Sequence, residues 1–80
     1  MMKIEIFGTG CAKCRRMYDN VVEAVKKTNE DADILKVSSI DDIIGRGVMI
    51  TPSLFIEGKE VVAGRVPSVD EIVKFFIENE

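Results

Sequence analysis

Residues 7–14 read Phe7-Gly8-Thr9-Gly10-Cys11-Ala12-Lys13-Cys14. An alternating apolar run, Met2 to Phe7, leads into this stretch and predicts a β-strand. A helical pattern with one apolar face leaves it and runs from Cys11 to about Thr28. The two cysteines are the only ones in the chain, and they occupy a strand-to-helix junction with C-x-x-C spacing. This arrangement favours thiol redox chemistry.

Length and charge narrow the class of protein. The 80 residues predict a single domain over residues 1–80. The net charge is -3, from 11 basic and 14 acidic residues, so we expect no nucleic-acid partner. No apolar run reaches the ~20 residues that a membrane span needs, and the N-terminus lacks a signal-peptide pattern. We therefore expect no membrane association and a cytoplasmic location, where a permanent structural disulfide is disfavoured.

Three further strands are predicted: Ala32–Val37, Ser53–Ile56 and Glu60–Ala63. The last two are joined by Gly58-Lys59, a two-residue turn suited to type II′. A helical crossover between the first two strands implies that they are parallel, whereas the hairpin implies an antiparallel pair. The expected sheet is therefore four-stranded and mixed.

Two more helices are predicted from capping boxes. Ser39 and Asp42 open a short helix that ends near Gly45, and Ser68 and Glu71 open a last helix that runs to the C-terminus. The element order is β-α-β-α-β-β-α, an α/β fold with three helices flanking the sheet.

This order, with C-x-x-C opening the first helix and Thr51-Pro52 ahead of the third strand, resembles the thioredoxin fold in its minimal, glutaredoxin-like form. The chain looks most like the small redox-active disulfide proteins of the thioredoxin superfamily found in archaea and bacteria. The resemblance covers essentially the whole chain and implies a monomeric thiol–disulfide oxidoreductase that binds no cofactor or metal. It implies as partners a disulfide-containing protein or small molecule, and an upstream thiol or protein reductase.

The resemblance also assigns roles to residues. Cys11 matches the nucleophile and Cys14 the resolving cysteine. Pro52 matches a proline that is cis and lies against the disulfide, and Thr51 matches the residue whose backbone pairs with an extended substrate. The expected substrate groove is lined by Gly10, Ala12, Lys13, Thr51, Pro52 and Gly64.

The residues themselves support the division of labour between the cysteines. Cys11 lies at a helix N-terminus, where unpaired N–H groups and partial positive charge favour the thiolate that attacks disulfides. Lys13, Arg15 and Arg16 follow within the next turn and a half and either add to this effect or serve only solubility. Cys14 continues the apolar stripe of the helix and is expected to be buried.

A proton relay is the less secure part of the resemblance. Thioredoxins keep a buried carboxylate six residues before the nucleophile, where this chain has Glu5, and a lysine facing it, where this chain has Lys36. We expect Glu5, positioned by Lys36, to exchange a proton with Cys14. The alternative is a solvated cross-strand pair worth under ~1 kcal/mol.

The chain also departs from the family pattern. Gly10 replaces the tryptophan that thioredoxins carry before the first cysteine, and Ala12-Lys13 is an unusual dipeptide between the cysteines. Two other functions stay open, namely a soft-metal carrier for Cu(I) or zinc that uses the same C-x-x-C, and a passive interaction module. Tyr18, one turn past Cys14, either lines the site or lies on the surface, and we expect the surface. Met49 is expected in the core.

Overall fold

The central strand, β1 (Met2–Phe7), has the predicted bounds in the computed structural model, which describes residues 1–78. β2 (Ala32–Val37) pairs with it in parallel on one side. β3 (Ser53–Ile56) pairs with it antiparallel on the other side, and β4 (Lys59–Ala63) pairs with β3. The strand order β2-β1-β3-β4 confirms the predicted four-stranded mixed sheet.

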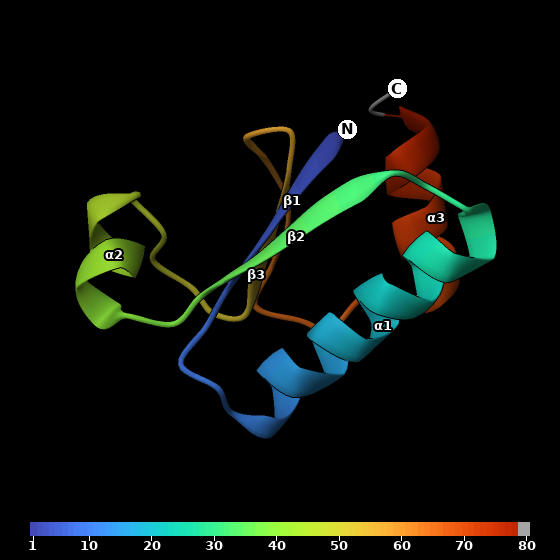
Figure 1. Ribbon diagram of the computed structural model, residues 1–80. Helices are drawn as coiled ribbons and strands as arrows, with labels where there is room; N and C mark the ends of the chain where they lie inside the picture. The colour runs from blue at the N-terminus through green and yellow to red at the C-terminus, as the bar shows by residue number, and fades with distance from the viewer. Residues whose placement is uncertain (79–80) are drawn as a thin grey trace.

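Helices cover both faces of this sheet. α1 (Ala12–Thr28) and α3 (Val69–Glu78) lie together on one face, and the short α2 (Ile40–Gly45) lies on the other (Figure 1). The order β-α-β-α-β-β-α is the predicted one. The predicted continuation of the last helix to the C-terminus falls on residues 79–80, outside the described residues.

Alternation along β1 divides the apolar residues between two cores. Met2, Ile4 and Ile6 pack with Met17 of α1 and Phe76 of α3 in the larger core. On the opposite face, a smaller core is formed by Phe7, Ile43 and Val48. β1 is therefore buried on both sides, and its last residue leads directly to the cysteine motif. Met49, which was expected in the core, is 93 % exposed, so that expectation is wrong.

The two predicted capping boxes differ in the structure. At α3 the box is confirmed, because the Glu71 N–H donates to the Ser68 Oγ over 3.1 Å and the Ser68 N–H donates to the Glu71 Oε1 over 3.2 Å. At α2, Ser39 is the N-cap residue but its side chain makes no capping hydrogen bond. The predicted box at Ser39 and Asp42 is therefore wrong, although the helix begins where it was expected.

The hairpin turn also differs from its prediction. The two residues between β3 and β4 are Glu57 and Gly58, with φ of 53° and 79°. Two positive φ values define a type I′ turn, not the predicted type II′ turn at Gly58-Lys59. Glu57 is held in this conformation by β1, because its N–H donates to the Lys3 carbonyl over 2.8 Å and its carboxylate accepts from the Lys3 N–H over 3.1 Å.

Candidate active site

The two cysteines lie at the start of α1 with their sulfur atoms 3.2 Å apart. Cys11 is the N-cap residue of the helix, in an extended conformation, and is exposed. Cys14 is one turn further along and only 7 % exposed. The two thiols are therefore in hydrogen-bond contact, with Cys11 facing solvent and Cys14 facing the protein.

The surroundings of Cys11 lower the pKa of its thiol. The largest cause is the hydrogen bond from the Cys14 thiol, followed by the backbone N–H of Cys14, while desolvation acts in the opposite direction. The backbone N–H of Lys13 contributes further. These are the N–H groups that a helix N-terminus leaves without a partner, so the terminus acts on Cys11 as the sequence indicated. The charges of Lys13, Arg15 and Arg16 are not among the causes of the shift.

Gly8 determines how closely Cys14 approaches the sheet. A Cβ atom built on Gly8 would overlap the Cys14 Sγ and would lie 3.9 Å from the Pro52 Cα. A glycine at this position therefore leaves the space that the buried Cys14 thiol occupies, next to the Pro52 backbone. This close approach connects the cysteine motif to a segment 38 or more residues later in the chain.

The segment around Pro52 has the cis bond that the resemblance implied and lies next to the end of β4. The Thr51–Pro52 peptide bond is cis. The Pro52 carbonyl accepts a hydrogen bond from the Gly64 N–H over 2.8 Å, which holds the end of β4 beside the proline. Gly64 has a φ of 82°, and an added Cβ would lie 2.9 Å from the Ile50 Cγ2. Of the predicted substrate-groove residues, the structure thus connects Pro52 with Gly64 and leaves Gly10, Ala12, Lys13 and Thr51 exposed.

Glu5 does not have the predicted partner. Its carboxylate accepts from both terminal nitrogens of Arg46, over 2.6 Å and 3.1 Å, at the end of α2. Lys36 is in register with Ile6 and lies over the Tyr18 ring of α1, 4.5 Å from its centroid. Since successive side chains on a strand alternate between faces, Glu5 and Lys36 lie on opposite faces of the sheet. The predicted Glu5–Lys36 pair is therefore wrong, and the relay that depended on it has no structural basis.

The Glu5 carboxylate is nevertheless buried, as the resemblance implied, at 3 % exposure. The hydrogen bonds from Arg46 lower the pKa of Glu5, against the effect of desolvation. The Arg46 guanidinium also lies over the Phe7 ring, 5.2 Å from its centroid. Glu5 thus has a fully paired position in the smaller core, on the face of the sheet away from α1.

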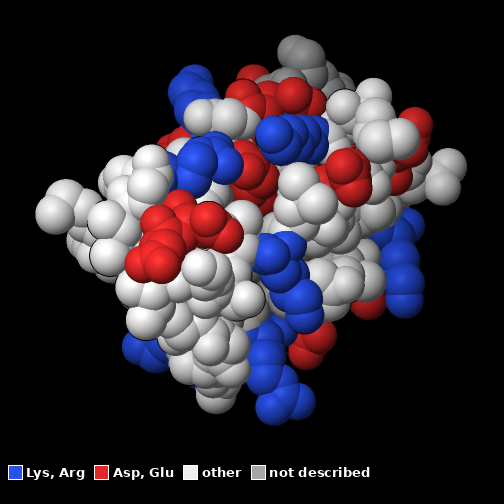
Figure 2. Space-filling view, turned by 60° about the vertical axis from the view of Figure 1, so that its left-hand side comes forward, with Lys and Arg blue, Asp and Glu red and all other residues white. Residues whose placement is uncertain are grey.

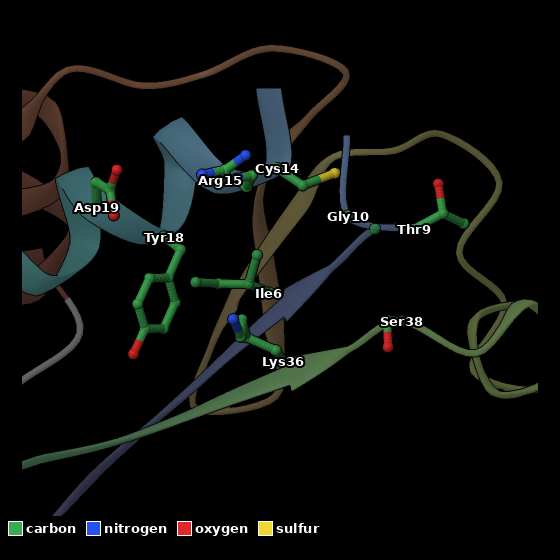
Figure 3. A pocket seen from close by; sticks show the side chains of 10 residues that line it. Ile6, Thr9, Gly10, Cys14, Arg15, Tyr18, Asp19, Lys36 and Ser38 are labelled. Atoms are coloured by element: carbon green, nitrogen blue, oxygen red, sulfur yellow. The ribbon is translucent and has the colours of Figure 1, made fainter. Parts of the chain in front are cut away.

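Sequence reasoning did not identify Arg46, and of the two places open to Tyr18 it expected the surface. Arg46 lies in a glycine-flanked loop, where an arginine gives no periodic signal. Tyr18 follows Cys14 by one helical turn, so its spacing does place it beside the site. It is half-buried and lines a groove of about 530 Å³ together with Cys14, which corrects the expectation that it lies on the surface. Figure 3 shows this groove between α1 and the β2 edge of the sheet.

Comparisons with known proteins agree with this geometry. The thioredoxin domain family matches residues 2–77. A thioredoxin of Methanothermobacter thermautotrophicus is 43 % identical over 74 residues, which cover 92 % of this chain and 96 % of that protein. A thioredoxin of Methanocaldococcus jannaschii is 40 % identical and covers 100 % of this chain and 95 % of its own. The solved structure of thioredoxin 1 from Thermosipho africanus superposes with a TM-score of 0.60 over 98 % of this chain and 99 % of that chain, at 22 % identity, and shows the same fold.

An exposed thiol with a lowered pKa, paired with a buried thiol at a helix start, defines a dithiol redox protein. The family match and the two relatives show which family this is. The chain belongs to the thioredoxin domain family and is a thiol–disulfide oxidoreductase. For the soft-metal carrier considered above, the two thiols are the only cysteine ligands that the sequence offers. Within residues 1–78, no three His, Cys, Asp or Glu side chains gather in a way that would hold a metal ion.

Proposed function

We propose that this protein reduces disulfides, with Cys11 as the nucleophile and Cys14 as the resolving thiol. The observation that carries this assignment is the asymmetry of the pair, since the two sulfur atoms are 3.2 Å apart but only Cys11 is exposed. An incoming disulfide reaches Cys11 and not Cys14. The lowered pKa of Cys11 supplies the thiolate at the exposed position.

The reaction runs in two exchanges. The Cys11 thiolate attacks one sulfur of the substrate disulfide, a mixed disulfide forms, and the other substrate sulfur leaves as a thiolate that takes a proton from solvent. Cys14 loses its proton and attacks the Cys11 sulfur, which forms the Cys11–Cys14 disulfide and releases the second substrate thiolate. The substrate gains two electrons and the protein loses two. An upstream dithiol or protein reductase returns these electrons to the cysteine pair.

Substrate recognition is proposed to use the backbone near Pro52. Thr51 is exposed, and none of the backbone hydrogen bonds outside helices and strands in residues 1–78 involves it. An extended substrate segment can therefore pair with the Thr51 peptide beside Cys11, in the manner of an added strand. Gly10, Ala12, Lys13 and Gly64 are proposed to border this segment, and Gly10 has no side chain to block it.

The partners are proposed to be disulfide-bearing proteins or small molecules, and not nucleic acid. Figure 2 shows a face on which basic and acidic side chains are interspersed and neither sign forms a continuous area. This mixture and the net charge of -3 support the proposal. No helix within residues 1–78 has both the length and the apolar character needed to cross a membrane. We propose a monomer that acts in the cytoplasm, where reduction is the favoured direction of exchange.

The test is insulin disulfide reduction driven by dithiothreitol, with wild type, Cys11→Ser and Cys14→Ser compared in parallel. We expect turnover by wild type, no turnover by Cys11→Ser, and a trapped mixed disulfide in Cys14→Ser that intact-protein mass spectrometry detects. Turnover by Cys11→Ser, or a mixed disulfide trapped on Cys14, would reverse the assigned roles. Absence of turnover by wild type on insulin and on 2-hydroxyethyl disulfide would reject the proposed function.

A further inference from the structure

The groove beside Cys14 is lined by an arginine, a tyrosine and a lysine, side chains that the exchange reaction itself does not require. α1 forms one wall with Arg15 and Tyr18, and the β2 edge forms the other with Lys36 (Figure 3). The loop residues Thr9 and Gly10 close the end nearest the cysteines. The volume of about 530 Å³ lies within the ~300–1,000 Å³ usual for small-molecule sites.

The groove carries two positive charges that form no ion pair among the described residues. Lys27, Arg46 and Arg65 each form an ion pair with a carboxylate. Within residues 1–78, by contrast, no carboxylate lies within ion-pair distance of Arg15 or Lys36. Lys36 instead lies over the Tyr18 ring at 4.5 Å, an arrangement that holds the ammonium group toward the groove while its N–H donors stay available. Asp19 is the single acidic residue in the lining.

The groove also lies next to the reactive sulfur of Cys11. Cys14 lines it, the Cys11 Sγ is 3.2 Å from the Cys14 Sγ, and Gly10 immediately precedes Cys11. In Figure 3 the Cys14 sulfur points toward the Gly10 end of the groove. A small group attached to Cys11 as a mixed disulfide is therefore next to the Gly10 end of the groove, whose lining includes Arg15 and Lys36.

We propose that this groove binds the body of a low-molecular-weight disulfide that carries a carboxylate or another anionic group, with Arg15 and Lys36 holding the anion. The proposal rests on the disulfide-reductase function proposed above and names a substrate class for the same cysteines. The chemistry is the two-step exchange already described, in which both halves of the small disulfide leave as thiols and a dithiol restores Cys11 and Cys14. A net charge of -3 repels anions at long range, so a preference for them must come from local groups such as these two cations.

The first experiment compares three small disulfides of similar length that differ in charge: 3,3′-dithiodipropanoate, 2-hydroxyethyl disulfide and cystamine. Reduction is driven by dithiothreitol, and each kcat/KM is divided by the rate of the same disulfide with dithiothreitol alone, since leaving-group basicity differs among them. We expect wild type to prefer the dianion over the neutral disulfide by about fivefold, and to disfavour the cation. The preference should shrink as salt rises, because exposed charges are screened.

Variants then locate the preference. Arg15→Gln and Lys36→Gln should each lower it to about twofold, and the double variant should remove it, whereas Lys36→Arg should retain it. Asp19→Asn should increase it. Arg16→Gln is the matched control, because it removes the same charge from the neighbouring residue of α1 without touching the groove. Circular dichroism of every variant verifies that the fold is kept.

A binding measurement gives a readout apart from turnover. In the Cys11→Ser/Cys14→Ser protein, which has no thiol to exchange, 3,3′-dithiodipropanoate should shift the amide resonances of Thr9 and Gly10 more than 2-hydroxyethyl disulfide does, and Lys36→Gln should abolish the difference. Equal normalised kcat/KM for the three disulfides, or an equal effect of Arg16→Gln, would overturn the inference while insulin reduction continued to support the proposed function. A dependence on Arg15 and Lys36 seen only with aspartate-bearing peptide disulfides would overturn it in favour of a site for protein substrates.

Discussion

Arg46, at the end of α2, forms a two-point ion pair with Glu5 of the central strand, with the shorter contact at 2.6 Å. The Glu5 side chain is 4 % exposed and that of Arg46 is 42 % exposed. The ion pair holds the end of α2 against the sheet, on the face opposite the groove beside Cys14. A charged carboxylate buried in the middle of a sheet has a high desolvation cost. The ion pair with Arg46 offsets this cost for Glu5.

We expect Arg46→Met to destabilise the protein by about 2–3 kcal/mol, because it leaves a buried carboxylate without a partner. This is below the value for fully buried pairs, since Arg46 is partly exposed to solvent. The double variant Glu5→Leu/Arg46→Met should recover most of the loss, because it removes the charge as well as its partner. Urea unfolding measures both. If the double variant proved less stable than Arg46→Met, the desolvation argument would fail.

The same pair makes stability depend on pH in a defined direction. The pKa of Glu5 is lowered in the folded state by the hydrogen bonds from Arg46, relative to an ordinary value of 4.5. A lowered folded-state pKa gives stability that is present above the unfolded-state pKa and lost as the pH falls through the folded-state pKa. The stability of wild type relative to Glu5→Gln should therefore shrink as the pH falls below about 4.5. Glu71, whose pKa is lowered by Arg65, contributes in the same direction, so the comparison is best made in a Glu71→Gln background.

In Arg46→Met, the pH dependence of the stability that Glu5 contributes should reverse its direction. Without the arginine, desolvation dominates and raises the pKa of Glu5 above its ordinary value. The variant should then be most stable, relative to Glu5→Gln/Arg46→Met, at low pH and should lose that stability as the pH rises through the raised pKa. Urea unfolding at several pH values between about 3 and 7 tests this, and a variant that lost stability on acidification as wild type does would contradict it.

The pKa of Cys11 should depend on Cys14 more than on the neighbouring cations. The hydrogen bond from the Cys14 thiol is the largest cause of the lowered value, and no side-chain charge is among the causes. Cys14→Ala should therefore raise the pKa of Cys11, and Cys14→Ser should raise it less, because a hydroxyl still donates. The pH dependence of iodoacetamide alkylation measures the shift. Arg16→Gln is the control, and a shift as large as that of Cys14→Ala would restore the charge-tuning interpretation.

Gly8→Ala should disturb the resolving cysteine specifically. Its methyl group would overlap the Cys14 Sγ, so we expect a loss of about 1–3 kcal/mol in stability and a release of the mixed disulfide slowed by about tenfold or more. Gly45→Ala is the matched control, since it has nothing within 4 Å of the new Cβ and lies in the last turn of α2. It should leave exchange unchanged. Stopped-flow measurement of the two exchange steps separates the variants, and equal rates would show that Cys14 moves away at no cost.

The two serines at helix starts should differ although their sequence signals are alike. Ser68→Ala removes a capping hydrogen bond of 3.1 Å and should cost about 1 kcal/mol. Ser39→Ala removes a side chain that makes no capping bond and should change stability by less than about 0.5 kcal/mol. Parallel thermal or urea unfolding compares them, and an equal cost would mean that Ser39 caps α2 in solution.

Local signals predicted most of the fold because they are properties of short segments. The alternation of Met2–Phe7, the apolar stripe of α1 and the Ser68 capping box each stabilise one element through neighbours within a few residues. The β3–β4 hairpin shows what local signals do not predict. Its length was predicted, but the turn moved by one residue because β1 holds Glu57 through Lys3, a contact between segments far apart in the chain.

By itself, the sequence determined the element order and the position of the two thiols at a helix start, since both depend on residue type and spacing. The cis proline was implied by the family resemblance. Only the tertiary structure decided which groups surround these residues. The resemblance assigned Lys36 to Glu5, whereas the faces of the sheet, not the spacing along the chain, gave it Arg46 at a separation of 41 residues. Lys36 was thereby left on the other face, over Tyr18 and beside Cys14. Side-chain direction alternates at every strand residue, so a partner across the sheet is defined only when register and helix placement are known.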